Sequence, residues 1–474
     1  MREDNLKIEP FEILHLHELK AHQEVNEHGT VTLKGTIHED KEQEYLALAF
    51  KASPMKIFIT NHEGLHEIWF DGVITGVEIE SDDHFKVITV EAKTGTCLMD
   101  VSLHTRTWQE PSLTYSDILS TYTPAYPSGA FIMKEADKSI PGFTMQYRET
   151  DWEFSKRMAS HFETVLTADF KAGGAKYYFG VPNNSNSSIE TLHYKTKRNV
   201  AEYKQKSGLG VSISEADTTY NIVRHREVYS LGDKINLNRS VGYVSKIESK
   251  LEGQEMYHTY YTKALNGFSV PKCYNLDGTG SSFSGIVTEI KKDEVKVALD
   301  IDENKGPCGF RWFPYATPYS TNDGTGWYAM PEKGDKVRVY IPAEDESSAY
   351  VTSSVHLVAQ GQPSNAQNSP ARENPDYKSI MNKYAKEVLF TPNSLTLTNN
   401  EGMSIQLLDE EGIKILSDKK IQIQADENIN IVSATGAILG LAKEEVLFRQ
   451  GSSGDILVKL NENIVVDGGE IHLD

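Results

Sequence analysis

An eight-residue repeat near the C-terminus constrains the fold of this chain more than any other feature. Each repeat holds two apolar residues separated by one residue, followed by a turn-forming group such as Asp409-Glu410-Glu411-Gly412. Eight residues allow one strand of about four or five residues plus a turn, with alternate side chains on a single face. The apolar pairs are Ile405/Leu407, Ile413/Ile415, Ile421/Ile423 and Ile429/Ile431, and after a break at 443–454 the pattern resumes as Ile456/Val458, Ile464/Val466 and Ile471/Leu473.

A single chain of such strands would leave an apolar face and unpaired strand edges in water. Three chains wound about one axis would enclose that face in a triangular prism with closed three-fold symmetry. A monomeric β-solenoid or a flat meander is the alternative. An octad is short for one chain to close a full solenoid turn, which favours a homotrimer with a C-terminal triangular β-helix over residues 391–474.

Length and charge limit the remaining possibilities. The chain has 474 residues, about three times the usual domain size, so several cores are expected. Acidic residues outnumber basic ones by 68 to 48, which argues against a specific nucleic-acid partner. No run of about 18 apolar residues occurs, and the polar N-terminus predicts synthesis in the cytoplasm without a signal peptide. The few cysteines exclude a disulfide framework.

Changes of pattern along the chain predict a mainly β protein with six segments. Short apolar runs between turn residues, such as Leu46-Ala47-Leu48, predict β structure in the first and third segments. The fourth has the size of a small closed barrel of the OB type. A polar stretch rich in Gln, Asn and Pro follows it. The expected segments are 1–110 (first β-barrel), 111–175 (helical insertion), 176–275 (second β-barrel), 276–358 (OB-fold domain), 359–390 (linker and short helix) and 391–474 (octad repeat).

Three helices are expected from local signals. Thr150 and Glu153 form a capping box, followed by an apolar stripe at helical spacing from Phe154 to Leu166. A second short helix is predicted around residues 116–122, before Pro124 and Pro127. A third is predicted from Asn374 to about Lys386.

Several segments of the chain resemble the VgrG and phage late control protein D families, the hub and central spike proteins of contractile tails. The segment Tyr147-Arg148-Glu149-Thr150-Asp151-Trp152-Glu153-Phe154 is the most specific match. Gly232-Asp233 with Tyr243-Val244 resembles the later hub. Further similar segments are Trp312-Phe313-Pro314, Gly326-Trp327-Tyr328, Met330-Pro331-Glu332-Lys333-Gly334-Asp335-Lys336-Val337 and Ser353-Ser354-Val355-His356.

The resemblance implies a homotrimer whose two hub β-barrels per chain form a pseudo-six-fold ring against a hexameric tail tube. The spike would puncture a target cell envelope, a mechanical role without catalysis or cofactors. The implied partners are tail tube and baseplate proteins and a separate spike-tip protein. The protein would be made in the bacterial cytoplasm and assembled into the baseplate of a phage tail or phage-tail-like particle. Phage, bacteriocin, type VI and extracellular injection systems all remain open.

Residues that could carry chemistry have simpler explanations. His15, His17, Glu18 and His22 include plausible zinc ligands, but alternation places both His15 and His17 on one strand face with no third ligand fixed, so a solvated face is favoured. Asp151 and Glu153 could act as acid and base, yet a helix N-terminus accounts for both.

Aromatic residues, cysteines and a C-terminal histidine lead to the same conclusion. Trp152 and Phe154 are expected in the core rather than as a sugar platform. Cys97, Cys273 and Cys308 lack a nucleophile signature, and no GxSxG, HExxH or Walker motif occurs. Three copies of His472 could hold a metal at the tip, but alternation with Ile471 and Leu473 points it outward. The sequence therefore predicts no catalytic, cofactor-binding or metal-binding residue.

Two rival functions remain. The first is a tail-associated enzyme that degrades cell wall or glycan, which would need roughly 100 or more further residues with their own core. The second is a surface adhesin with a β-prism stalk, which the missing signal segment disfavours.

Overall fold

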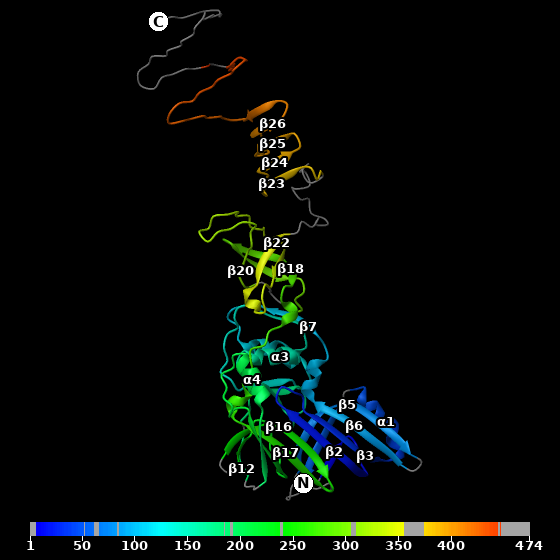
Figure 1. Cartoon of the computed structure of the whole chain (residues 1–474). Helices are drawn as coiled ribbons and strands as arrows, with labels where there is room; N and C mark the ends of the chain where they lie inside the picture. The colour runs from blue at the N-terminus through cyan, green and yellow to red at the C-terminus, as the bar shows by residue number, and fades with distance from the viewer. Residues whose placement is uncertain are drawn as a thin grey trace, which may run out of the picture. The chain divides into compact units, whose positions relative to one another are not determined.

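A computed structural model describes residues 6–51, 53–60, 66–82, 85–183, 185–189, 193–237, 240–304, 310–354, 374–443 and 446. The chain is mainly β, as predicted, and divides into two compact units, residues 1–358 and 359–474. Figure 1 shows the strands and helices of both units. In the described part, none of the helices has the length and apolar character that crossing a bilayer requires.

The two predicted hub β domains share one sheet, because β2 and β16 pair with each other. Among the described residues this sheet has twelve strands, in the order β1-β4-β5-β6-β3-β2-β16-β17-β14-β13, with β15 beside β16 and β12 beside β15. The β2–β16 pair is antiparallel and runs from Glu24 opposite Lys246 to Lys20 opposite Lys250. The strands are β1 (Leu6–Glu9), β2 (His15–Glu24), β3 (Thr30–Ile37), β4 (Pro54–Thr60), β5 (His66–Asp82), β6 (Phe85–Thr94), β12 (Asn186–Ile189), β13 (Tyr194–Arg198), β14 (Thr219–His225), β15 (Lys234–Leu237), β16 (Ser240–Glu252) and β17 (Glu255–Lys263).

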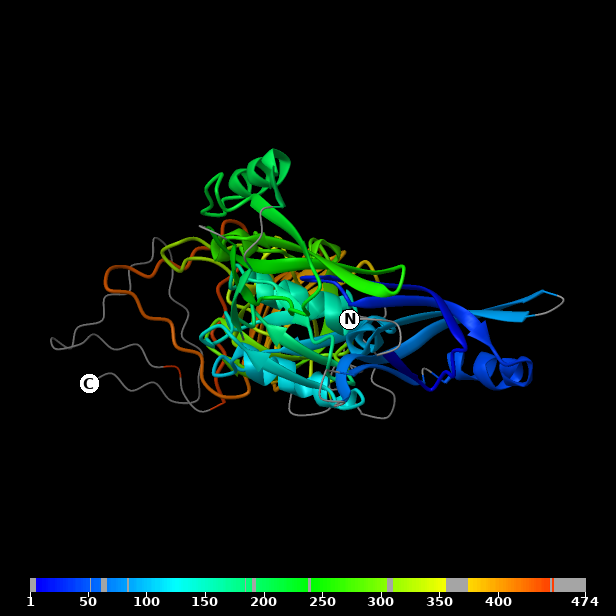
Figure 2. The ribbon, with the colours of Figure 1, turned by 90° about the horizontal axis from the view of Figure 1, so that it is seen from below.

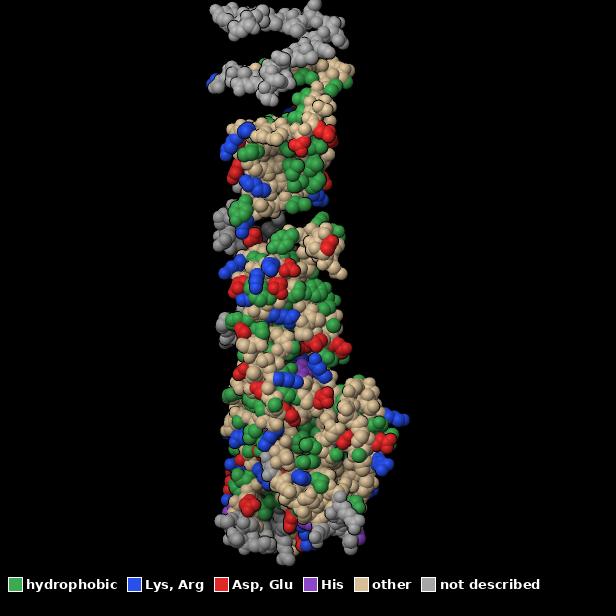
Figure 3. Space-filling view, turned by 90° about the vertical axis from the view of Figure 1, so that its left-hand side faces the viewer, with side chains coloured by type: hydrophobic (Ala, Val, Ile, Leu, Met, Phe, Trp, Pro, Cys, Tyr) green, Lys and Arg blue, Asp and Glu red, His purple; other side chains and the backbone are tan. Residues whose placement is uncertain are grey.

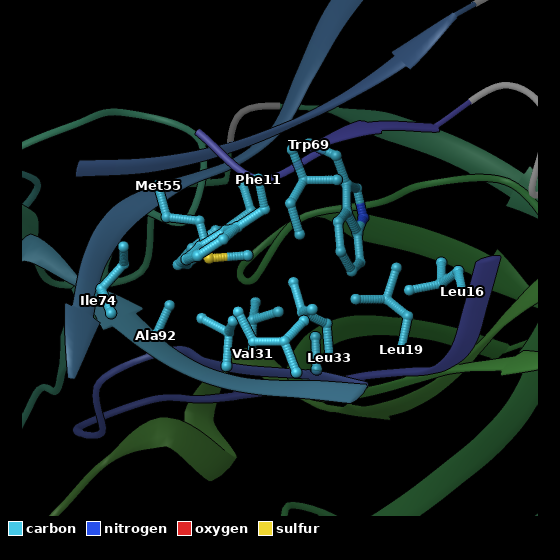
Figure 4. Close-up of a cluster of buried hydrophobic side chains, with 14 of the residues drawn as sticks. Phe11, Leu16, Leu19, Val31, Leu33, Met55, Trp69, Ile74 and Ala92 are labelled. Atoms are coloured by element: carbon cyan, nitrogen blue, oxygen red, sulfur yellow. The ribbon is translucent and has the colours of Figure 1, made fainter. Parts of the chain in front are cut away.

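Alternating side chains build the core of the first half of this sheet. In β3 every second residue is buried, and Val31 and Leu33 point inward with Leu19 of β2. Figure 4 shows these side chains facing Phe11, Met55 and Trp69. Leu251 and Met256, at the β16–β17 turn, complete the same core.

Two helices occupy segments that were predicted as strands. Helix α1 (Glu42–Ala49) contains Leu46 and Leu48, so the strand prediction there is wrong; its Glu, Gln, Leu and Ala residues are strong helix formers. Helix α4 (Val200–Gly208) lies inside the third predicted segment. Figure 2 shows α1 in blue and α4 in green at separate outer edges of the first unit.

The predicted helices of the second segment are confirmed. Helix α2 (Tyr115–Tyr122) and helix α3 (Asp151–Ser160) both begin with capping boxes, and Thr150 and Glu153 make the box that the sequence predicts. The apolar stripe is shorter than expected, because α3 ends at Ser160 and Leu166 begins a strand. The nearby strands are β7 (His104–Trp108), β8 (Ala130–Met133), β9 (Thr144–Glu149), β10 (Leu166–Ala168) and β11 (Lys176–Phe179). Short 3-10 turns are η2 (Glu39–Lys41), η3 (Gly95–Asp100), η4 (Thr123–Ala125), η5 (Leu265–Phe268), η6 (Leu276–Gly278) and η7 (Glu346–Ser348).

A five-stranded barrel follows, in the strand order β20-β19-β18-β21-β22. Its inward residues, among them Val295, Val297 and Phe313, are fully buried. The strands are β18 (Ser282–Lys291), β19 (Glu294–Leu299), β20 (Phe313–Pro314), β21 (Lys336–Tyr340) and β22 (Tyr350–Ser354).

The second unit is an antiparallel meander of five strands in its described part. The short helix predicted from Asn374 is wrong: Asn374 accepts a bond from the Asp376 amide in a turn, and the next residues form a strand paired with β24. Strands β26 and β27 fall on the first two predicted octads. The strands are β23 (Lys378–Met381), β24 (Glu387–Thr391), β25 (Ser394–Thr398), β26 (Ser404–Leu408) and β27 (Gly412–Leu416). The octads from 456 onward lie outside the described residues.

Candidate assembly interface

The four residues considered as metal ligands lie on β2 without forming a site. His15 and His17 are exposed, with ring centroids 4.9 Å apart, and His17 Nε2 lies 2.8 Å from Thr36 Oγ1. Glu18 pairs with Lys20, and His22 pairs with Glu24 at 3.5 Å. Within the described ranges, no group of three or more His, Cys, Asp or Glu side chains is placed to hold a metal.

Asp151 and Glu153 are occupied by structural bonds. Asp151 is buried and accepts from Arg106 Nη1 at 2.5 Å, Tyr126 Oη at 2.7 Å and Gln146 Nε2 at 2.9 Å. Glu153 accepts the Thr150 amide at 3.0 Å. Glu153 makes the predicted capping box, and Asp151, the first residue of α3, anchors the helix start to Arg106, Tyr126 and Gln146.

Trp152 and Phe154 are core residues, which confirms that prediction. Phe154 stacks on Trp108 with ring centroids 5.1 Å apart, and Trp152 packs edge-on against Tyr177. The indole N–H of Trp152 donates to the Asn26 carbonyl at 3.3 Å.

The cysteines offer no reactive cluster. Cys97 is half-buried, and burial raises the pKa of its thiol to about 11, so little thiolate exists at neutral pH. Cys273 is exposed. Cys308 and His472 lie outside the described residues.

A buried ion-pair network joins α3 to the OB barrel. Arg157, near the end of α3, donates to Glu149 at 2.8 Å through both Nε and Nη2 and to Glu346 of η7 at 2.9 Å through Nη1. Although burial opposes it, the two carboxylates raise the pKa of Arg157 above its ordinary value. Glu346 lies 189 residues after Arg157, so no local sequence signal reveals this contact.

The strand pair β7–β9 and the residue before β9 also contact the OB barrel. Phe143 and Met145 are buried in the barrel's own apolar core, where Phe143 meets Phe313 edge-on at 5.3 Å. The Thr107 amide donates to Asp302 at 3.0 Å. The helical segment and the OB barrel therefore share an apolar core and polar bonds within the first unit.

The C-terminal sheet presents two rows of apolar side chains on one face. Residues directly opposite each other across neighbouring strands share a face, and residues two apart along a strand do so as well. The first row contains Ile380, Val388, Leu397, Ile405 and Ile415, and the second contains Phe390, Leu395, Leu407 and Ile413. The opposite face carries a polar row of Thr396, Gln406 and Lys414.

These two rows, the apolar face, are largely in water. Ile405 is 42% exposed, Ile415 is 52% exposed and Ile413 is 71% exposed. A hollow of about 800 Å³ runs along the first row. None of the described residues of this unit is buried, and Figure 3 shows hydrophobic side chains gathered on its surface. Exposed apolar surfaces of this size are typical of sites that contact another protein, a membrane or a ligand.

The apolar pairs continue past the last strand. Ile421, Ile423, Ile429 and Ile431 are all more than half exposed, and the residues around them have no strand partner among those described. The apolar pairs of the first two octads share one face of β26 and β27, as the pattern predicts. The described strands of this chain form a meander, and the three-chain β-helix stays a prediction.

Comparison with known proteins identifies the barrel. Residues 283–356 match the family described as the type VI secretion system/phage-baseplate injector OB domain, which covers the barrel almost from end to end. No curated protein sequence matches the chain.

Solved structures resemble a larger part of the chain. The c3393 protein of E. coli, a component of the type VI secretion system, is 13% identical with a TM-score of 0.52, covering 74% of this chain and 99% of its own. A chain of the Francisella PdpA–VgrG complex is 11% identical with a TM-score of 0.50, covering 86% of this chain and 87% of its own. The fold is therefore similar to that of the type VI secretion protein c3393 and of a chain of the PdpA–VgrG complex.

Proposed function

We propose that this protein is the hub and central spike of a contractile tail or injection machine and that it works as a homotrimer. The hub would join a hexameric tail tube to a three-fold spike, and the spike would be driven through a target cell envelope. The tail tube, baseplate proteins and a separate spike-tip protein are the proposed partners. The protein would be made in the bacterial cytoplasm and act within an assembled particle, without cofactor or catalysis.

The apolar face of the C-terminal sheet is the observation that carries this proposal. Fully burying one Leu or Ile side chain contributes roughly 1.5–3 kcal/mol, so two exposed rows favour association strongly. Three copies around one axis would direct all three faces inward and leave the row of Thr396, Gln406 and Lys414 outside. The VgrG-like fold supports this choice of symmetry over a face-to-face dimer.

The first unit supports a mechanical role. A spike must receive a push from the hub without bending at the joint between them. Arg157 with its two carboxylates, and Phe143 and Met145 inside the barrel core, resist hinge motion between the helical segment and the OB barrel.

The test is the solution mass of the full chain over a range of concentrations. We expect a persistent mass of three chains of 53.1 kDa each. Substituting Ile405→Glu together with Ile415→Glu places charges at two paired positions of the apolar face and should release single chains with a folded hub. The matched control is Gln406→Glu with Lys414→Glu, the neighbouring pair on the opposite face, which should remain trimeric. Well-folded single chains of unmutated protein, or a stable dimer, would overturn the proposal.

A tail-associated enzyme acting on cell wall or glycan is the alternative. The positions considered for catalysis, Asp151 and Glu153, are engaged in bonds that start α3. Incubating the purified trimer with peptidoglycan and measuring soluble fragments tests this alternative, and robust turnover would replace the mechanical role.

A further inference from the structure

A hairpin in the OB domain, residues 318–329, is ordered by its own hydrogen bonds and not by packing. The Thr321 amide donates to the Thr325 carbonyl at 2.8 Å, and the Trp327 amide donates to the Tyr319 carbonyl at 2.9 Å. Gly326 has φ +152°, and a Cβ there would lie 2.3 Å from the Tyr319 carbonyl oxygen, so glycine is required. The Thr325 amide also donates to the Asp323 carboxylate at 2.9 Å. The hairpin therefore has a defined shape.

This fixed shape presents aromatic side chains to water. Every residue from 318 to 329 is exposed, and Trp327 and Tyr328 are 62% and 74% exposed. The Tyr328 hydroxyl donates to the Lys292 carbonyl at 2.9 Å, which ties the hairpin's base to the β18–β19 turn. Tryptophan and tyrosine on a rigid support are typical of the centre of protein interfaces.

A complementary surface lies on the outer face of the same barrel. Ile286 of β18 is 40% exposed and lies in register between Ala298 of β19 and Lys336 of β21. Arg338 is the next outward residue of β21. Lys336 is paired with Asp300 at 3.5 Å, so Arg338 is the cation of this surface that an aromatic ring could stack on. The hairpin carries Asp323 and no lysine or arginine, which complements the charge of Arg338.

The hairpin and this surface belong to different sides of the barrel. The hairpin leaves from β20, an edge strand, whereas β18 is the central strand. Figure 1 shows it projecting on the β20 side, away from the β18 label. Copies arranged head to tail could each give a hairpin and receive one. Such contacts close into a ring when the rotation between copies is a whole fraction of a turn.

We infer that residues 318–329 form an arm that docks Trp327 and Tyr328 on the Ile286, Lys336 and Arg338 surface of a second copy of this chain. This inference rests on the proposed homotrimer and names a contact in it separate from the apolar face. The arm would set the angle between neighbouring OB barrels.

Tryptophan fluorescence tests whether the arm is covered. Trp69, Trp108 and Trp152 are buried, and Trp312 is half-buried with Lys296 Nζ 4.7 Å from its ring. Trp327, at 62% exposed, is therefore the most accessible indole of a free chain. In the trimer, replacing Trp327→Phe should leave the acrylamide-quenchable fraction unchanged. In single chains released by Ile405→Glu with Ile415→Glu, the same replacement should lower it. A drop in the intact trimer would overturn the inference.

Cross-linking tests where the arm docks. A chain with Trp327→Cys and Ile286→Cys, and with Cys273 and Cys308 replaced by serine, should form covalent species up to three chains on mild oxidation. Chains with one of the two new cysteines are the controls and should not. Trimers that fail to cross-link, or that cross-link only within a chain, would overturn the docking contact and leave the proposed function standing. Single chains of unmutated protein on light scattering would instead remove the proposed function itself.

Discussion

Strand β6 in the hub and strand β27 near the C-terminus have the same alternating pattern and opposite outcomes. Ile88 and Val90 of β6 are fully buried, whereas Ile413 and Ile415 of β27 are more than half exposed. The difference is the layer opposite the sheet. In the hub, the chain folds back to supply Phe11, Met55 and Trp69, while in the C-terminal unit the described residues supply nothing. Alternation thus specifies which face is apolar, and the rest of the chain decides whether another molecule must cover it.

The largest expected effect is a loss of stability of the first unit when its buried ion-pair network is removed. Arg157→Met would leave the buried Glu346 and the partly buried Glu149 without their cation, which typically costs about 3–5 kcal/mol of stability. Urea unfolding followed by tryptophan emission measures the loss. The matched control is Arg224→Met, whose pair with Glu252 is solvent-exposed and should contribute at most about 1 kcal/mol. Equal losses of unfolding free energy in both variants would mean that the Arg157 network stabilises the first unit no more than an exposed ion pair does.

A smaller effect is the pH dependence of stability, which we expect in the first unit and not in the described part of the C-terminal unit. His258 of β17 is buried, with Nδ1 2.7 Å from Ser249 Oγ, and burial lowers its pKa to about 4. In the unfolded chain His258 binds a proton near pH 6.5, whereas in the folded chain it does so only near pH 4. Its contribution to stability is therefore complete above pH 6.5 and falls as the pH drops toward 4. We expect His258 to contribute a loss of up to about 1.4 kcal/mol per pH unit in that window.

Thermal unfolding of the body at pH 7 and pH 5 measures this slope. His258→Asn should reduce the slope and leave the part that comes from His161, whose pKa burial lowers to about 3. His17→Asn, at an exposed position of β2, should leave the slope as it is. The described residues of the C-terminal unit contain no histidine, so the slope belongs to the body. An unchanged slope in His258→Asn would assign the pH dependence to other groups.

The smallest effect concerns the start of α3. Thr150→Ala removes the cap on the Glu153 amide and should cost about 1 kcal/mol. Thr121→Ala in α2 is the control, because alanine is favoured within a helix. Denaturant midpoints of the two variants compare them directly, and an equal loss would show that the cap is dispensable in the packed body.

Local signals predicted local structure well. The capping box of α3 and the strands β26 and β27 follow from residues within one turn or one octad of each other. Two failures have the same local origin. Leu46 and Leu48 alternate like a strand but lie among helix formers in α1, and the segment from Asn374 contains turn residues that lead into β23 and not into a helix.

Contacts between distant residues could not be predicted in this way. The pairing of β2 with β16, the insertion of Phe143 into the OB core and the Arg157–Glu346 bond each join residues far apart in sequence. The exposure of Trp327 could not be predicted either, because the sequence does not show which residues cover an aromatic side chain. The apolar face is the exception, since its eight-residue period predicts both the side chains and their shared direction.

The shared core of the helical segment and the OB barrel has a consequence for anyone recombining such proteins. A junction placed before β18 would separate Phe143 and Met145 from the barrel that encloses them. It would also leave Arg157 without Glu346. A chimera that keeps residues up to 354 together retains all of these contacts. Fusion points for additional protein domains should therefore be placed downstream of β22.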